Sequence, residues 1–178
     1  MLYIKLIAER NGEKMKRVLL DTNIYGEIAI DTHLELLREK VVSGEKAIFY
    51  GLDVVRKELR ATPTSKKIGG KSLRILLLSL YDSIIRHEIL AAREAEELAE
   101  HYFNVYSELG GIKSKDDIRK DFIIVACASI KKLDVVVSND EKSMLSETAL
   151  KAYAIVNGIK KIPEPDFIPY KDFRRWFV

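Results

Sequence analysis

The stretch KRVLLDTNIYGEI, residues 16–28, decides how the rest of the chain is interpreted. Its apolar run, Val18-Leu19-Leu20, predicts a buried strand. The run ends on an acid, Asp21, which is followed by Thr22 and Asn23. A carboxylate at the end of a buried strand needs partners, because an unpaired buried charge costs several kcal/mol. The rest of the chain must therefore supply residues that lie close to Asp21 and pair with it.

Apolar runs and helical periodicities alternate along the whole sequence. Strands are expected over 17–20, 46–51, 83–89 and 133–140, and helices over 31–42, 52–61, 73–80, 90–109, 115–132 and 143–157, with a loop over 62–71. The strands are continuous apolar runs, which is typical of a parallel sheet covered on both faces. The sequence therefore predicts a three-layer α/β/α fold with a mainly parallel sheet.

Length and composition indicate one domain over residues 15–178, preceded by a 14-residue extension. The extension either adds a strand or hairpin, turning at Asn11-Gly12, or is an appendage. A single cysteine, Cys127, excludes an intramolecular disulfide and is expected in the core. The chain has no run suited to a membrane and no clear signal peptide, so a cytoplasmic location is expected. The histidines His33, His87 and His101 share no motif and are expected at the surface.

Four acids stand in unusual positions. Asp21 and Asp140 each follow an apolar strand, and the carboxyl ends of parallel strands lie at one edge of a sheet. Asp121 precedes FIIVACASI, a run without charge, which predicts a buried helix. Glu58 follows Val54-Val55 on the helix predicted over 52–61. Any one of them alone could be a helix cap or a solvated side chain.

Together the four acids favour a hard divalent cation. Carboxylates that share a pocket raise one another's pKa unless a cation is present. Oxygen ligands without His or Cys select Mg²⁺ or Mn²⁺ over zinc. Such an ion can bind a phosphate and activate water.

These motifs resemble those of the PIN-domain ribonucleases, a family that includes VapC-type toxins. VLLDTNIY resembles the first motif with Asp21, and DVVRKEL the second with Glu58. DFIIVACASIKKLDVVVSND resembles the joined third and fourth motifs with Asp121 and Asp140, and PDFIPYKDF is similar to the tail of archaeal members. The resemblance covers residues 15–173, most of the chain.

The resemblance implies a five-stranded parallel sheet, a homodimer and Mg²⁺- or Mn²⁺-dependent hydrolysis of RNA that leaves a 5′-phosphate and a 3′-hydroxyl. It implies that Asp21, Asp121 and Asp140 are metal ligands, and that Glu58 is a ligand or holds water at the metal. Three further residues, Thr22, Asn23 and Ser138, would position these carboxylates. Asp53 is the substitute if the second motif slips. The protein is then a toxin with a small antitoxin, or an RNA-processing nuclease, because the extension and the long middle segment depart from compact toxins.

Other residues carry weaker expectations. A solvated face is the simpler explanation of the basic residues, and the functional one is contact with phosphates by Lys66, Lys67, Lys71, Arg74, Lys115, Arg119 and Lys120. Asp117 is either a helix N-terminal acid or an outer-shell metal group. The apolar residues of 73–80 and 90–109 exceed the needs of one helix face and suggest a dimer interface.

Three alternatives compete with this interpretation. A haloacid dehalogenase-like phosphatase normally has an acid where this chain has Asn23. A receiver-like signalling domain has adjacent acids after its first strand, whereas Leu20 precedes Asp21. The third alternative is a catalytically inactive PIN-like module that binds RNA or protein.

Overall fold

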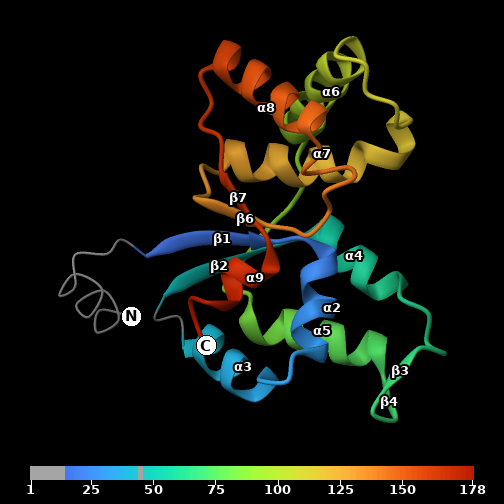
Figure 1. The fold of residues 1–178 in the computed structure, drawn as a ribbon, viewed down its shortest axis with the longest axis vertical. Coiled ribbons are helices and arrows are strands. Elements are labelled where there is room, and N and C mark those ends of the chain that lie inside the picture. The colour runs from blue at the N-terminus through green and yellow to red at the C-terminus, as the bar shows by residue number, and fades with distance from the viewer. Residues whose placement is uncertain (1–14, 44–45) are drawn as a thin grey trace.

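The computed structural model describes residues 15–43 and 46–178 (Figure 1). The strand or hairpin expected within residues 1–14 lies outside the described residues. A five-stranded sheet runs through the middle of the domain in the order β5-β2-β1-β6-β7, and each pairing in it is parallel. Its strands are β1 (Lys16–Leu20), β2 (Ala47–Leu52), β5 (His87–Ile89), β6 (Val135–Val137) and β7 (Asp166–Ile168).

Helices cover both faces of this sheet, as the sequence predicted. On one side lie α6 (Arg93–Glu108), α7 (Lys115–Ile130) and α8 (Glu147–Lys160) (Figure 1). On the other lie α2 (Thr22–Ile30), α3 (Leu34–Ser43) and α5 (Leu73–Ile84), with α4 (Asp53–Ala61) beside them. The fold is therefore the expected three-layer α/β/α arrangement around a parallel five-stranded sheet. No helix within 15–43 or 46–178 is long and apolar enough to cross a membrane.

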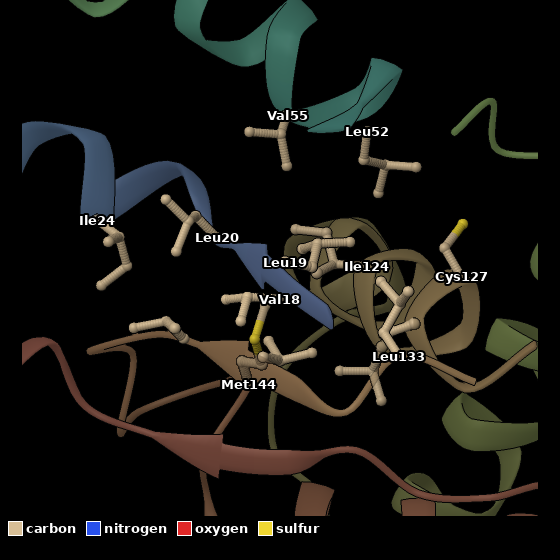
Figure 2. Packing of buried hydrophobic residues seen from close by; sticks show 14 of the residues in the cluster. Val18, Leu19, Leu20, Ile24, Leu52, Val55, Ile124, Cys127, Leu133 and Met144 are labelled. Carbon is tan, nitrogen blue, oxygen red and sulfur yellow. The ribbon is translucent and has the colours of Figure 1, made fainter. Parts of the chain in front are cut away.

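The core forms where β1 lies between its two neighbours. Val18, Leu19 and Leu20 are each at most 1% exposed. Figure 2 shows them among side chains from the α4 region and from α7, including Val55 and Cys127. The expected burial of Cys127 and exposure of the three histidines are confirmed.

Two secondary-structure predictions need correction. The strand expected over 83–89 is confined to its second half, because α5 continues to Ile84. Leu77, Tyr81 and Ile84 are buried at helical spacing, so burial of one helix face decides the conformation there. The loop expected over 62–71 contains a short antiparallel hairpin, β3 (Lys67–Ile68) and β4 (Lys71–Ser72).

The tail forms an edge strand followed by a short helix. Residues 166–168 form the edge strand β7, which pairs with β6, and α9 (Tyr170–Arg174) follows. Asp31, the C-cap of α2, holds α9 in place: its carboxylate accepts from Arg174 Nε at 2.6 Å and from the Tyr170 hydroxyl at 2.8 Å. The Arg174 guanidinium lowers the pKa of Asp31 to about 2.

This ion pair predicts an acid-sensitive contribution to stability. Asp31→Asn should lower the free energy of unfolding by about 2 kcal/mol at neutral pH, because a charge-assisted pair is lost. The folded pKa of about 2 lies below the unfolded value, so the wild-type advantage is complete above about pH 4 and disappears as pH falls through 2. Urea unfolding of both proteins across this range measures it.

Asp172→Asn is the matched control for this prediction. Asp172 pairs with Arg175 within the tail, but its side chain is 39% exposed, against 6% for Asp31. Its removal should change stability by less than about 0.5 kcal/mol. Equal losses in the two variants would contradict the role given to Asp31.

Candidate metal and nucleic-acid site

Asp21 lies at the point where β1 ends and α2 begins. It is the N-cap of α2, and its Oδ1 accepts from the Thr22 backbone N–H at 2.7 Å. The residue is only 6% exposed. Its Oδ2 accepts from the Ser138 hydroxyl at 2.6 Å and from the Asn23 amide at 2.7 Å. The cap and the two side-chain donors fix the orientation of this carboxylate.

The end of β6 brings Asp140 to the same edge of the sheet. The Asp21 backbone N–H donates to the Val137 carbonyl at 3.0 Å, which joins the ends of β1 and β6. The Ser138 hydroxyl, already bonded to Asp21, also accepts from the Asp140 backbone N–H at 3.1 Å. One serine therefore connects two of the four acids, although 119 positions separate these in the sequence.

Glu58 reaches the site from α4. Its Oε2 accepts from the Thr22 hydroxyl at 2.9 Å, next to the cap formed by Asp21. Asp53, the substitute candidate, points elsewhere: its carboxylate accepts from the Ala91 backbone N–H at 3.0 Å and from Lys57 Nζ at 2.8 Å. The geometry therefore favours Glu58 over Asp53 as the acid that the second motif contributes.

Asp121 enters from α7, on the opposite face of the sheet. The residues after it, 122–129, are all buried, as the uncharged run predicted. The pKa of Asp121 is raised to about 7: burial is the main cause, the negative charges of Asp21 and Asp140 add to it, and hydrogen bonding with Ser143 opposes it. Burial likewise raises the pKa of Asp21, to which Glu58 and Asp140 add. The four acids thus share one electrostatic environment.

Ser143 is the site residue that the sequence interpretation missed. It is 3% exposed, and its hydroxyl donates to Asp140 Oδ2. It also lies close enough to Asp121 to lower the pKa of that carboxyl. Its backbone N–H donates to Asp140 Oδ1 at 2.9 Å. The available signal was the spacing, because a serine three residues after an aspartate is typical of a turn closed by side-chain to backbone bonds.

The donor set suits Mg²⁺ or Mn²⁺ in type. Within the described part of the chain, no three His, Cys, Asp or Glu side chains form a ready cluster around a metal position. Mg²⁺ does not need one, since it keeps several waters and is commonly held by one or two carboxylates. Burial, with a smaller contribution from the neighbouring carboxylates, raises the pKa values of Asp21 and Asp121, and a bound cation would favour their charged forms. The residues therefore fit such an ion.

The remaining predicted site residues differ in the contacts that their side chains make. Lys115, Arg119 and Lys120 of α7 pair with Glu100, Glu96 and Glu58 respectively. Lys66, Lys67 and Lys71 lie in or beside the β3-β4 hairpin, and Arg74 donates to the Thr62 carbonyl. Asp117 is bonded to Ser114, the N-cap of α7, so capping accounts for it and an outer-shell role stays a prediction.

Comparisons with known proteins agree with the fold. No protein-family model and no curated protein matches the sequence. The crystal structure of DNA-bound VapBC from Salmonella typhimurium contains a chain that superposes with a TM-score of 0.54 at 16% identity, over 88% of this chain and 99% of that one. A chain of VapBC2 from Rickettsia felis, bound to a DNA fragment from their promoter, gives 0.51 at 17% identity, over 86% and 98%. At these identities the likeness is one of fold.

Because the four acids lie close together, replacing one of them is expected to stabilise the metal-free protein, whereas most substitutions of buried residues destabilise a protein. Asp121→Asn should raise the free energy of unfolding of the metal-free protein by about 1–3 kcal/mol at about pH 8, because an ionised, partly buried carboxylate is removed. Adding Mg²⁺ or Mn²⁺ should stabilise the wild type and stabilise Asp121→Asn less. Thermal unfolding with and without the ion measures both effects.

Asp166→Asn serves as the matched control for this measurement. Asp166 is exposed and begins β7, so it lies at the edge of the sheet opposite Asp21. Its substitution should leave both the stability and the response to metal unchanged. A destabilised Asp121→Asn with an undiminished metal response would refute the shared site.

Proposed function

We propose that this chain is a metal-dependent endoribonuclease that hydrolyses RNA phosphodiester bonds at Asp21, Glu58, Asp121 and Asp140. The observation that carries the proposal is the meeting of these acids from β1, α4, α7 and the end of β6 at one edge of the sheet, with the pKa values of Asp21 and Asp121 raised. The fold shared with VapBC chains supports it. Mg²⁺ or Mn²⁺ is the proposed cofactor.

Some residues of the chain would hold the cation, and others would orient the side chains that hold it. Asp21, Asp121 and Asp140 would hold the cation, with Glu58 as a further ligand or a holder of water. Ser138 and Asn23 orient Asp21, Thr22 orients Glu58, and Ser143 orients Asp140. A bound divalent ion supplies charge stabilisation at the phosphate and a water of lowered pKa. The bonds among these side chains fix the acids before RNA binds.

The proposed setting is cytoplasmic, with RNA as the substrate. The similar structures are VapBC complexes, so a small antitoxin protein is a proposed partner, and the chain is either such a toxin or an RNA-processing nuclease. A homodimer is also proposed. In α5, Ile75 is 69% exposed and available for such a contact, whereas α6 uses its apolar face against α7 and α8.

A second candidate is a PIN-like module that binds RNA or protein without cutting. One observation favours it: Lys120 Nζ lies 3.6 Å from Glu58 Oε1, so a lysine already neutralises part of the acidic site. The pair is weak, because the two side chains are 61% and 39% exposed. A cation could displace it.

Cleavage of a labelled single-stranded RNA tests the nuclease directly. The wild type should cut with Mn²⁺ or Mg²⁺ and stop in EDTA. Asp121→Asn should reduce the rate at least about a hundredfold, because one ligand and its charge are lost. Products should carry a 5′-phosphate and a 3′-hydroxyl, which end-specific labelling identifies.

The control and the contrary outcomes separate the candidates. Asp166→Asn makes the same chemical change away from the site and should cut at the wild-type rate. Folded wild-type protein that shifts RNA mobility and never cuts with either metal would establish the binding module instead. Cutting that survives both EDTA and Asp121→Asn would show that these acids are not the site.

A further inference from the structure

One segment of the chain carries an isolated positive charge. Residues 59–81 contain five basic side chains and no acid, whereas the whole chain balances 30 basic residues against 27 acidic ones. Three of the five, Lys66, Lys67 and Lys71, lie in or beside the β3-β4 hairpin. We call residues 66–72 the basic arm. A segment that contains basic residues and no acids is typical of a surface that contacts a polyanion.

The basic arm has a defined shape that its sequence supports. Lys67 pairs with Ser72 and Ile68 with Lys71 across the hairpin. Gly69 and Gly70 form its turn at φ values of 55° and 78°, a backbone that glycine adopts without strain. The Leu73 N–H donates to the Lys66 carbonyl at 2.8 Å and closes the base. Figure 1 shows the hairpin projecting beyond α4 and α5.

The lysines of the basic arm differ from those of α7 in their partners. Lys66, Lys67 and Lys71 are exposed, and within residues 15–43 and 46–178 none of them forms an ion pair. Of the other predicted phosphate contacts, Lys115, Arg119 and Lys120 each lie within ion-pair distance of a glutamate, and Arg74 bonds the Thr62 carbonyl. Among the predicted phosphate contacts, the lysines without an acidic partner in the described part of the chain are therefore those of the arm.

The arm follows directly from the helix that supplies Glu58. α4 ends at Ala61, and Arg74 Nε bonds the Thr62 carbonyl at 2.6 Å, which ties the base of the arm to that end. The chain from Glu58 to the tip at Gly69 spans at most about 30 Å. A stacked nucleic acid strand covers that distance in about ten nucleotides. A bound RNA could therefore reach both the acids and the arm.

The composition of the arm specifies what it could recognise. Residues 60–75 contain no Phe, Tyr, Trp or His, so the arm offers no ring on which a base could stack. Its strands are two residues each, too short to follow a groove. What remains is lysine charge, which binds phosphates without regard to base sequence.

We propose that the basic arm binds backbone phosphates of RNA several nucleotides away from the bond that is cut. The substrate is then an RNA long enough to span both the acids and the arm, and short fragments bind poorly. This inference rests on the proposed nuclease function for its choice of RNA. It adds the class of substrate, which is long single strands or the unpaired ends of structured RNA. The arm would hold these RNAs independently of their sequence.

Binding of RNA of two lengths tests the arm. All proteins carry Asp121→Asn so that the RNA stays intact. Affinities are measured by fluorescence anisotropy for strands of about 5 and about 20 nucleotides. The variant Lys66→Gln/Lys67→Gln/Lys71→Gln is compared with Lys16→Gln/Lys131→Gln/Lys160→Gln, three exposed lysines towards the opposite edge of the sheet. Each triple variant removes three positive charges and changes the formal net charge equally. Thermal unfolding confirms that both fold.

The arm variant should lose at least about tenfold of its affinity for the longer RNA, and the slope of log K against log salt should fall by about 2. The ratio of affinities for long and short RNA should fall with it, while the control variant keeps the ratio of the parent. Equal losses in both variants, or an unchanged ratio in the arm variant, would overturn the proposal. So would an arm variant that keeps RNA binding and loses an acidic protein partner. Separately, folded wild type that binds long RNA through the arm and never cuts it would refute the nuclease and leave the arm intact.

Discussion

The parallel pairing of β1 with β6 determines where the acids of this protein meet. Leu20 pairs with Val137, so the next residue of each strand, Asp21 and Ser138, emerges at the same edge. Their side chains then meet in a bond of 2.6 Å. Because β1 also pairs with β2, the helix that follows β2 brings Glu58 to the same place. The acidic site is thus a consequence of strand order in the sheet.

The same arrangement of acids that would bind a cation destabilises the folded protein when no cation is bound. Buried carboxylates repel one another and lose hydration, and both effects raise the pKa values of Asp21 and Asp121. Hydrogen bonds from Ser138, Ser143 and Thr22 offset part of the cost. The remainder is stored at the site and would be released when a cation binds. The ion pair of Asp31 with Arg174, which anchors α9, shows the opposite case of a carboxylate fully compensated by its partner.

Much of the fold could be predicted because its signals are local. Val18-Leu19-Leu20 before Asp21 indicates both a buried strand and its end, and the uncharged run after Asp121 indicates a buried helix. The site residues of the motifs follow from these two patterns together with the resemblance. Whether they hold a metal stays a prediction.

Other features depend on partners distant in the sequence. Nothing near residues 166–168 shows that they pair with β6, because the strand is short and flanked by prolines. Ile84 belongs to α5 only because its face is buried with that of Tyr81. Ser143 was overlooked because a serine in a polar turn is common, and its value appears only when Asp121 and Asp140 are seen beside it.

Anomalous diffraction from a crystal soaked in Mn²⁺ measures whether the four acids share a divalent cation. A shared site should give an anomalous difference peak at the carboxyl edge of the sheet, in contact with carboxylate oxygens of Asp21 and of Asp121 or Asp140. The peak should be absent from an isomorphous crystal of Asp121→Asn or greatly reduced in it. No peak at this edge under saturating Mn²⁺, or a peak bound by other residues, would show that these acids do not share a cation.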